Sequence, residues 1–258
     1  MPTIGYHIRG LVKAVGIIKS IKILTFRVLG IEKYVTVKVR DFNFVVRTMD
    51  SDLFVLSQIF GWEEYRIDSN RLKILRNIVS KWLDAGLTPV IIDAGANVGY
   101  SSLYFYDTFP GVCILSIEPD PTSFSVLKLH TQAYSHIKPV NAALWSHDRG
   151  LELMSSDTGS WGTQVTEGAG VPSNRLDALI GEIPNARTLI IKLDIEGAER
   201  EVVESCPEIF IDTKCIVVEP HDFKTPGSAC LFPLYKVAGQ KKFDTILNGE
   251  NIFLFSLD

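Results

Sequence analysis

Residues 90–100 of the chain read Val-Ile-Ile-Asp-Ala-Gly-Ala-Asn-Val-Gly-Tyr, an apolar run that leads into glycines and then into a helical pattern. The run predicts a buried strand, a tight turn and a helix, the unit with which a doubly wound sheet binds a nucleotide-like ligand. We expect Gly95 to let the backbone turn and approach that ligand, and Gly99 to let the helix pack closely on its strand. The residues around these glycines then decide which ligand fits.

Two residues of this turn favour a cationic ligand over a dinucleotide. The dinucleotide fingerprint requires a glycine where this chain has Asn97, whose side chain crowds the place of a pyrophosphate. Asp93 at the strand end would repel a pyrophosphate but attract the ammonium group of a methionine moiety. Glu118 ends the next apolar run about 20 residues further on, the spacing of an acid that accepts hydrogen bonds from ribose hydroxyls. The pattern predicts S-adenosylmethionine as the cofactor.

From Pro89 onward short apolar runs alternate with helical segments, as in βα units around a parallel sheet. The expected strands are 90–94, 112–117, 138–144, 189–193 and 215–218, and the expected helices are 98–108, 121–134, 175–182 and 198–205. Residues 243–247 and 252–255, joined by Asn248-Gly249, predict an antiparallel hairpin. The predicted fold class is α/β, a doubly wound Rossmann-like methyltransferase sheet of seven strands, mostly parallel, with a C-terminal antiparallel hairpin.

The sequence predicts an N-terminal helical and β extension over residues 1–85 and a cofactor-binding domain over 86–258. Apolar residues at helical spacing predict one or two amphipathic helices over 4–31, and period-two alternation predicts a hairpin over 33–48. A short helix with a loop over 52–65 and a helix capped by Ser69 follow.

The first 48 residues contain nine Lys and Arg against two acids, a net charge of +7 that leaves −11 for the remainder. Two partners for the basic amphipathic helices stay open, namely the protein's own core and an anionic membrane surface. Nucleic acid is not an expected partner, because the acidic catalytic half lacks the basic face that phosphates demand.

Composition excludes several other classes of protein. The chain has 258 residues, 46% hydrophobic and 22% charged, which is typical of a globular protein. Lysines and arginines interrupt the most apolar N-terminal stretch, so neither a membrane span nor a signal peptide is expected. We therefore expect a cytoplasmic protein, with contact to the inner face of the membrane left open. The four cysteines form no CxxC pair and predict reduced core thiols, with a disulfide or a zinc site as the alternatives.

Residues 189–199 again pass from an apolar strand into acids and a glycine, beside the turn already described. Alternation along a strand predicts that Lys192, Asp194 and Glu196 point to one side, at the ligand edge. We predict a site role for Asp194. Glu199, on the helix that follows, is as readily a helix cap or a surface salt bridge.

The apolar run 215–218 leads into Glu219, Pro220 and His221, which brings a carboxylate and an imidazole to the same edge. A neutral imidazole has the pKa of a general base near pH 7, so we predict that His221 accepts the proton of an acceptor hydroxyl, with a binding or structural role as the alternative. Asp194 would orient the cofactor or the hydroxyl. The other histidines, His7, His130, His136 and His147, are expected on the surface or on helices, and no spacing indicates a metal cluster.

Several motifs reinforce each other along the chain. They are residues 92–100, 117–120, 141–144, 175–177, 192–199 and 219–221, together with Ser51-Asp52-Leu53 and Glu64-Tyr65 upstream. Over about residues 50–222 they resemble the FkbM-type S-adenosylmethionine-dependent methyltransferase family. The resemblance implies O-methylation of a hydroxyl on a glycan, sugar or secondary metabolite, and it implies that Asn141 and Ala142 lie near the adenine. The polar stretch at 159–163, Gly-Ser-Trp-Gly-Thr, leaves the acceptor pocket unassigned.

The predicted site thus combines cofactor-binding and catalytic residues, and no metal. The cofactor-binding set is Asp93, Gly95, Ala96, Asn97, Gly99, Tyr100, Glu118, Pro119, Asn141, Ala142 and Asp194, and the catalytic set is Asp194, His221 and Glu196. The expected acceptor is a small molecule or a glycan. Two rival functions remain, a non-catalytic S-adenosylmethionine-binding or membrane-associated scaffold and an NAD(P)-dependent oxidoreductase. No pattern indicates the oligomeric state.

Overall fold

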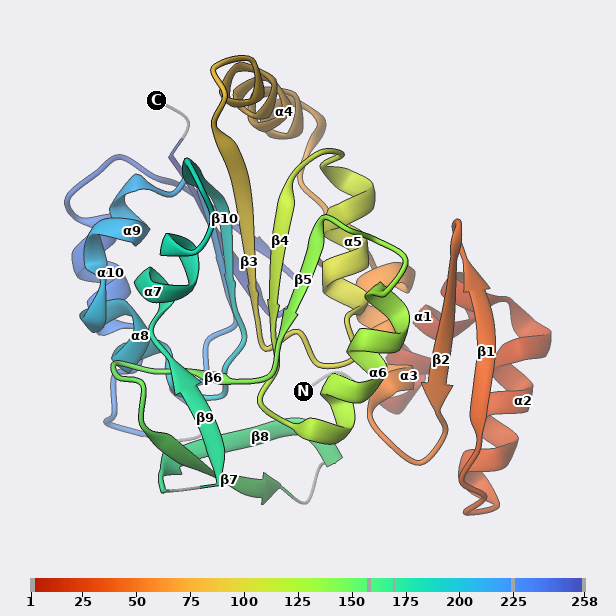
Figure 1. The fold of residues 1–258 in the computed structure, drawn as a ribbon. Helices are drawn as coiled ribbons and strands as arrows, with labels where there is room; N and C mark the ends of the chain where they lie inside the picture. The colour runs from red at the N-terminus through yellow and green to blue at the C-terminus, as the bar shows by residue number, and fades with distance from the viewer. Residues whose placement is uncertain (1–2, 157–158, 169, 224–225, 257–258) are drawn as a thin grey trace.

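The computed structural model describes residues 3–156, 159–168, 170–223 and 226–256, and a seven-stranded sheet forms its centre (Figure 1). The strands lie in the order β12-β13-β11-β10-β3-β4-β5, of which β11, β10, β3, β4 and β5 are parallel and β13 and β12 antiparallel. Their bounds are β3 Thr88–Ala94, β4 Cys113–Ile117, β5 Ile137–Val140, β10 Ala186–Leu193, β11 Cys215–Val218, β12 Asp244–Asn248 and β13 Asn251–Phe255. The predicted fold class is confirmed.

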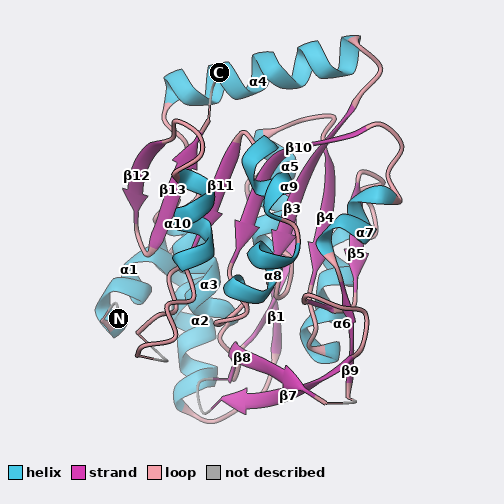
Figure 2. Cartoon of the chain, turned by 90° about the vertical axis from the view of Figure 1, so that its left-hand side faces the viewer, coloured by secondary structure: helices cyan, strands magenta, loops and turns pink. Residues whose placement is uncertain are grey.

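Helices cover both faces of the sheet, because the inner strands are apolar on both sides. Ile91 belongs to one hydrophobic core and its neighbour Ile92 to the other. Helices α7 (Leu176–Gly181), α8 (Glu199–Ser205), α9 (Pro207–Asp212) and α10 (Phe232–Ala238) lie on the face turned to the viewer in Figure 2. Helices α5 (Tyr100–Thr108) and α6 (Pro121–Thr131) lie on the opposite face.

The register of the parallel strands brings their carboxyl ends to one edge of the sheet, the lower edge in Figure 1. Asp93 of β3 is paired with Lys192 of β10 on one side and with Ser116 of β4 on the other. Leu193 at the end of β10 is paired with Val218 at the end of β11. This is the edge at which α/β sheets hold ligands.

The strand predicted over 138–144 is interrupted. It ends as β5 at Val140 and resumes as β6 (Ala143–Leu144), because the side chain of Asn141 donates hydrogen bonds to the carbonyl oxygens of Glu118 and Pro119. β6 then joins β9 (Val171–Asn174), β7 (Gly150–Ser156) and β8 (Gly159–Glu167) in a second sheet that the sequence did not predict. The stretch 159–163 lies in β8, and its side chains are outside the described part of the chain.

The N-terminal elements follow the predicted pattern. Amphipathic helices α1 (Ile4–Val15) and α2 (Ile17–Val28) precede the hairpin of β1 (Tyr34–Val39) and β2 (Phe42–Arg47), and α3 (Asp52–Leu56) runs into a π-helical turn, η1 (Ser57–Gly61). Helix α1 crosses η1 so closely that a Cβ on Gly61 would lie 2.1 Å from the carbonyl oxygen of Gly10. Across the described residues, no helix has the length and apolar character needed to traverse a bilayer.

The extension shares one hydrophobic core with the sheet, so the boundary predicted at residue 85 stays a prediction. The hydroxyl of Tyr100 in α5 donates to the carbonyl oxygen of Val45 at 2.8 Å, and the amide of Val45 donates to Nε2 of His130 at 2.8 Å. Figure 1 shows the β1–β2 hairpin beside α6. The basic N-terminal part is therefore packed on the protein's own core along one side at least.

Three local expectations are corrected or completed. Helix α4 (Ser69–Asp84) is capped by Asp68, whose side chain accepts from the amides of Asn70 and Arg71, and not by Ser69. His7 and His130 lie on helices α1 and α6, one of the two places expected, and both are buried, since a neutral ring that is hydrogen-bonded can lie in a core. The four cysteines are free and buried, as predicted.

Candidate active site

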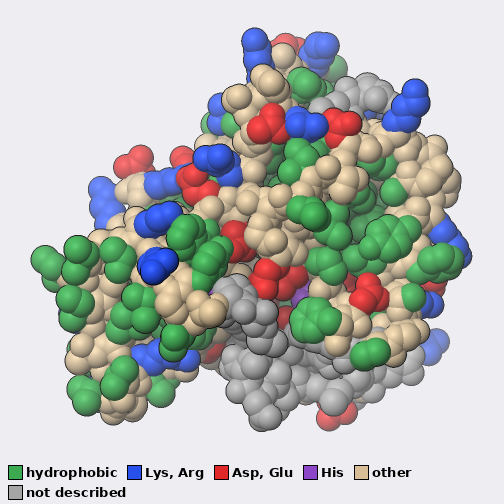
Figure 3. Space-filling view, turned by 180° about the vertical axis from the view of Figure 1, so that it is seen from behind, with side chains coloured by type: hydrophobic (Ala, Val, Ile, Leu, Met, Phe, Trp, Pro, Cys, Tyr) green, Lys and Arg blue, Asp and Glu red, His purple; other side chains and the backbone are tan. Residues whose placement is uncertain are grey.

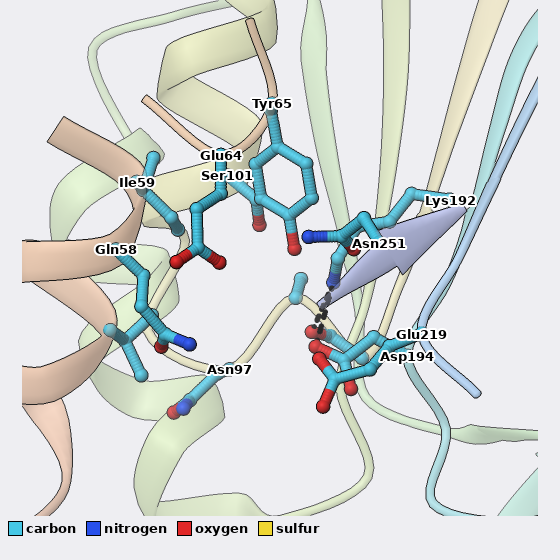
Figure 4. Close-up of a pocket in the computed structure, with 13 residues that line it drawn as sticks. Gln58, Ile59, Glu64, Tyr65, Asn97, Ser101, Lys192, Asp194, Glu219 and Asn251 are labelled. Atoms are coloured by element: carbon cyan, nitrogen blue, oxygen red, sulfur yellow. Dashed lines mark hydrogen bonds and ion pairs between the residues drawn. The ribbon is translucent and has the colours of Figure 1, made fainter. Parts of the chain in front are cut away.

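A pocket opens at the carboxyl ends of β3, β10 and β11, between the sheet and the N-terminal extension (Figure 4). It is lined by Val55, Gln58, Ile59, Glu64, Tyr65, Gly95, Ala96, Asn97, Ser101, Lys192, Asp194, Glu219 and Asn251. In Figure 4, Gln58 and Asn97 lie on one side and Asp194 and Glu219 on the other. On this face of the molecule, acidic side chains gather around a hollow near the centre (Figure 3). The pocket joins the glycine turn to the acids that the sequence placed at the same edge.

The glycine turn is shaped by the protein's own backbone and not only by a ligand. Gly95 has a φ of +77°, and a Cβ there would lie 1.8 Å from the carbonyl oxygen of Asp194. Lys192 donates from Nζ to the carbonyl oxygen of Gly95 at 2.8 Å and thereby holds the turn against β10. Gly99 lets α5 approach α6, since a Cβ there would lie 2.5 Å from Cδ1 of Leu127. The sequence predicted instead that Gly99 lets α5 pack closely on β3.

Asp93 does not face the pocket, contrary to the prediction that it meets a ligand's ammonium group. Its side chain is fully buried, and Oδ2 accepts from the hydroxyls of Ser101 and Ser102 at 2.7 and 2.6 Å. Lys192 lies 3.1 Å from Oδ1. Two hydroxyls and an ammonium group therefore satisfy this carboxylate internally, and its role is to hold β3, α5 and Lys192 together.

Tyr100 is likewise directed into the core, where its ring packs against Phe44 and His130. Its hydroxyl bonds to a backbone carbonyl of β2. The predicted contact of this side chain with the cofactor is not supported by the structure, because the first turn of α5 points it away from the pocket. Only the backbone at this position lies near the glycine turn.

The predicted ribose ligand, Glu118, directly follows β4, and both of its carboxylate oxygens accept hydrogen bonds from backbone amides. The amides of Asn97 and Asp120 each donate to it at 2.8 Å. Burial raises the pKa of Glu118 to about 7 against the lowering effect of these bonds. Because Asn141 bonds to the backbone of Glu118 and Pro119, the four residues Glu118, Pro119, Asn141 and Ala142 form one corner of the edge. Their contacts with the cofactor stay predictions.

A cluster of four carboxylates surrounds the imidazole of His221. Nδ1 bonds to Oε1 of Glu199 at 2.8 Å, while Nε2 lies 3.3 Å from Glu196, 3.7 Å from Glu219 and 3.8 Å from Asp194. The structure thus brings together the three predicted catalytic residues, Asp194, Glu196 and His221. Glu196 reaches the cluster through a left-handed turn with φ of +58°, after β10 has ended, and not through strand alternation.

The cluster changes the ionisation predicted for His221. Burial alone would lower its pKa, but the hydrogen bond to Glu199 and the charges of Asp194 and Glu196 outweigh burial and raise the pKa to about 9. This geometry therefore favours the protonated ring over the neutral ring expected from the sequence. Burial and the charge of Asp194 also raise the pKa of Glu219.

The imidazole lies behind the pocket wall. His221 is only 1% exposed, whereas the side chains of Asp194 and Glu219 are 20% and 16% exposed and line the pocket. A reactant in the pocket meets these two carboxylates before it meets the ring. Glu199, fully buried and bonded to His221, is neither a cap nor a surface salt bridge.

Several pocket residues escaped the sequence prediction. Gln58, Glu64, Tyr65 and Asn251 come from η1, the loop after it and β13, all distant in sequence from the glycine turn. Glu64 and Tyr65 belong to the upstream motifs that resemble the FkbM family, and this resemblance was the signal that pointed to the loop. No signal in the sequence pointed to Gln58 or Asn251. The hydroxyl of Tyr6 donates to Glu64 at 2.9 Å, and burial raises the pKa of Glu64 to about 7.

The pocket fits a cationic nucleoside cofactor better than an anionic one. Acidic side chains outnumber Lys192 in its lining, and the ammonium group of Lys192 is already engaged by Asp93 and Gly95. Oδ1 of Asn97 is buried and makes no hydrogen bond within the described residues, so it can accept one from a ligand. A pyrophosphate would meet these carboxylates at unfavourable distances.

Residues 93–247 match the family described as the methyltransferase FkbM domain. "Methyltransferase 1" of Beauveria bassiana is 30% identical over 162 residues, which cover 52% of this chain and 65% of that protein. "Methyltransferase sdnD" of Sordaria araneosa is 38% identical over 68 residues, 25% of this chain and 26% of that protein. The chain therefore spans less than two thirds of these relatives.

A solved structure of methyltransferase FkbM from Methylobacillus flagellatus is similar to this one with a TM-score of 0.47 and 14% identity. The similarity covers 81% of this chain and 61% of that one.

Proposed function

This chain belongs to the FkbM methyltransferase family, and on that premise we propose that it is an S-adenosylmethionine-dependent O-methyltransferase acting on a hydroxyl of a glycan, sugar or secondary metabolite. The observation that carries the proposal is the meeting of Asp194 and Glu219 with the glycine turn in one pocket. A hydroxyl is a poor nucleophile at neutral pH, so its methylation needs a group that takes its proton. These two carboxylates line the pocket together with Gly95, Ala96 and Asn97 of the glycine turn.

The pocket wall opposite the carboxylates supports an acceptor with several hydroxyls. Gln58, Glu64, Tyr65 and Asn251 offer amide, carboxylate and phenol groups there. Such groups bond to the alternating donors and acceptors of a sugar or polyol. Glu64 already accepts from Tyr6 and Gln58 donates to Glu250, but Oδ1 of Asn251 is buried and makes no hydrogen bond within the described residues. A purely apolar acceptor would leave it so, at a cost of about 1–3 kcal/mol.

S-adenosylmethionine, when bound, supplies a methyl group on a positively charged sulfur. Asp194 then holds the acceptor hydroxyl and takes its proton as the oxygen–carbon bond forms. Lys192, 3.6 Å from Oδ2 of Asp194, keeps this carboxylate directed into the pocket. His221 positions Asp194, Glu196 and Glu219 from behind. Positioning of this kind contributes about 7–11 kcal/mol to catalysis, and a proton acceptor about 10²–10⁴-fold in rate.

Calorimetry and methyl transfer together test this function. We expect S-adenosylhomocysteine to bind and NAD not to compete, and radiolabelled methyl groups to appear on hydroxylated acceptors from a panel of sugars, polyols and phenols. Binding of NAD in place of S-adenosylhomocysteine would support the oxidoreductase. Cofactor binding without transfer to any acceptor would support the non-catalytic scaffold.

We also propose a cytoplasmic location, with no nucleic acid among the partners. Four buried, free thiols fit a reducing compartment. The acidic surroundings of the pocket disfavour a phosphate backbone. Fractionation of cells that express the full chain, with a cytosolic and a periplasmic or secreted marker, tests the location.

A further inference from the structure

We propose that Asp194, Glu219 and His221 form a binding site for one divalent transition-metal ion at the wall of the pocket. The proposal rests on the proposed function, in which the same pocket holds the acceptor hydroxyl. One ligand atom from each of the three residues lies within 4.8 Å of the others.

The separations in this trio fit a shared ion better than direct bonds. Nε2 of His221 is 3.8 Å from Oδ1 of Asp194 and 3.7 Å from Oε1 of Glu219. These distances are too long for hydrogen bonds, which end near 3.2 Å for nitrogen and oxygen. Two ligands bound to one ion at about 2.0–2.2 Å lie roughly 3–3.5 Å apart, so the two distances from Nε2 would shorten by a few tenths of an ångström. The ligand oxygens of Asp194 and Glu219 lie within 4.8 Å of each other and would move together.

A second, independent observation points to a ligand at this place. Nε2 of His221 is buried and makes no hydrogen bond within the described residues, although the ring is 1% exposed and faces three carboxylates. The other ring nitrogen, Nδ1, bonds to the buried carboxylate of Glu199 at 2.8 Å. A carboxylate that fixes one nitrogen of a histidine while the other is directed at an ion is the usual support of a metal ligand.

The charges around the trio favour a divalent ion. Asp194, Glu196 and Glu219 face Nε2, and Glu199 faces Nδ1. The basic group of Lys192 lies beside the other oxygen of Asp194 and is shared with Asp93. One imidazole and two carboxylates are a ligand set that suits Mn²⁺ or Zn²⁺ better than Ca²⁺ or Mg²⁺. Because only an unprotonated nitrogen binds a metal, the ion would take the place of the proton on Nε2, and that proton would leave to water. Because Asp194 and Glu219 line the pocket, the ion has an open position toward it.

That open position gives the ion a role in the transfer. An acceptor hydroxyl bound to the ion would lose its proton more readily. Oδ1 of Asp194 is the oxygen turned to His221, so Oδ2 would accept the proton, which would then pass to water. The oxygen then forms its bond to the methyl carbon as the carbon–sulfur bond breaks and the sulfur keeps the electron pair. No oxidant or reductant is involved.

Titration of the cofactor-free full chain with Mn²⁺, followed by electron paramagnetic resonance of the free ion, tests the site. We expect one ion per chain with a Kd below about 100 µM, weakened at least about tenfold in His221→Gln and in Glu219→Gln. His136→Gln, which alters an exposed histidine, is the matched control and keeps the wild-type Kd. A thermal shift with S-adenosylhomocysteine checks that each variant is folded. If one of the two site variants does not fold, Asp194→Asn is measured in its place.

The outcomes separate this proposal from the function on which it rests. Absence of Mn²⁺ binding at 1 mM, or binding in both site variants equal to that of the wild type, overturns the metal site. Full methyl transfer after dialysis against a chelator overturns the role of the ion while the methyltransferase stands. Mn²⁺ bound as expected, with no transfer to any acceptor, supports the metal site and contradicts the proposed function.

A different observation carries a second inference, that helix α2 docks on an anionic membrane surface. Ile17, Ile18, Ile21, Val28 and Leu29 are between 59% and 85% exposed and follow one side of α2 and its end. The opposite side buries Ser20 and Ile23. Figure 3 shows hydrophobic side chains with Lys and Arg among them on the outer part of the molecule at the left. The apolar side of α2 is therefore left uncovered by the described residues.

Charge complementarity selects the occupant of this apolar side. Lys19 and Lys22 are exposed within the same helix, and residues 1–48 carry a net charge of +7. Anionic lipids attract such a segment by about 1 kcal/mol for each basic residue near the surface. A second copy of the chain would bring two equally basic helices together, which disfavours a dimer through α2.

Co-sedimentation of the full chain with vesicles tests the membrane surface. We expect binding to vesicles of phosphatidylcholine with about 30% phosphatidylserine at low salt, little binding to pure phosphatidylcholine, and loss of binding in the double variant Ile18→Ser, Val28→Ser. Leu129→Ser removes an exposed leucine from α6 and keeps binding. No binding to anionic vesicles, or a dimer in solution that the double variant dissolves, overturns the inference.

Discussion

The ammonium group of Lys192 lies 3.1 Å from Oδ1 of Asp93, and both side chains are withdrawn from water, with 2% and 0% of their surface exposed. The pair joins neighbouring strands, β10 and β3, directly beneath the glycine turn. Lys192 also donates to the carbonyl oxygens of Ala94 and Gly95. One buried side chain thus connects the strand, the turn and the acid that follows β10.

Lys192→Met is therefore expected to destabilise the protein by about 3–5 kcal/mol, because it leaves the Asp93 carboxylate buried without its counter-charge. Chemical denaturation measures the change. The double variant Asp93→Asn, Lys192→Met should lose much less than the sum of the single losses. Lys138→Met, at an exposed position of β5, is the matched control with little effect. Equal losses in Lys138→Met and Lys192→Met would refute the role of the pair.

Gly95→Ala should weaken binding of S-adenosylhomocysteine at least about tenfold, because the new Cβ collides with the Asp194 carbonyl and displaces the turn. Gly86→Ala separates backbone strain from this collision, since Gly86 also has a positive φ, +72°, but no atom of the described residues comes within 4 Å of the place its Cβ would take. Calorimetry should find normal affinity in Gly86→Ala. Normal affinity in Gly95→Ala would mean that the turn tolerates the shift.

Binding of S-adenosylhomocysteine should strengthen as the pH rises from 6 to 8. Burial raises the pKa of Glu118 to about 7, so the side chain passes from the neutral acid to the carboxylate in this range. Only the carboxylate has both oxygens available to accept ribose hydroxyls while it keeps the amides of Asn97 and Asp120. In Glu118→Gln the affinity should be lower and independent of pH. A pH dependence that survives in Glu118→Gln would assign it to another group.

Glu64 makes the free energy of unfolding fall as the pH rises, whereas an acid in a salt bridge makes it rise. Burial raises its pKa from the ordinary value of 4.5 to about 7, so between these values the folded chain binds the proton more tightly than the unfolded chain. The stability is fully present below pH 4.5 and is lost as the pH rises to about 7. Glu64→Gln should remove this loss and raise stability at pH 8 by roughly 1–3 kcal/mol relative to the wild type. Thermal unfolding at pH 5 and pH 8 measures it, and parallel curves for the two proteins would count against it.

Asp194→Asn should lower kcat by about 10²-fold or more and leave the affinity for S-adenosylhomocysteine within a few-fold, because the lost group acts on the acceptor's proton. His221→Gln should also lower kcat, with KM for the acceptor rising as the carboxylates lose their support. Glu182→Gln, at an exposed carboxylate outside the pocket lining, serves as the control. A variant of Asp194 that keeps wild-type turnover would move the proton acceptor to Glu219 or Glu196.

Much of the fold was predictable because it depends on local patterns. The apolar runs of β3, β4, β10 and β11 and the glycine at 95 are legible in the sequence, and parallel strands bring the residues after their carboxyl ends to one edge. The small sheet of β7, β8 and β9 was missed because its strands are short of apolar residues, and the helices α9 and α10 were missed as well.

The sequence by itself therefore determined the sheet, the edge that carries the site and the kind of cofactor, since strand alternation and the placement of acids at strand ends are properties of neighbouring residues. Only the tertiary structure decided whether each acid has a structural role or lines the pocket. Asp93 and Asp194 look alike in the sequence, yet one is buried against Lys192 and two serines while the other lines the pocket. Likewise, the charge state of His221 and the contribution of Gln58 and Asn251 depend on segments that meet only in space, because burial and Coulomb interactions act across distance and not along the chain.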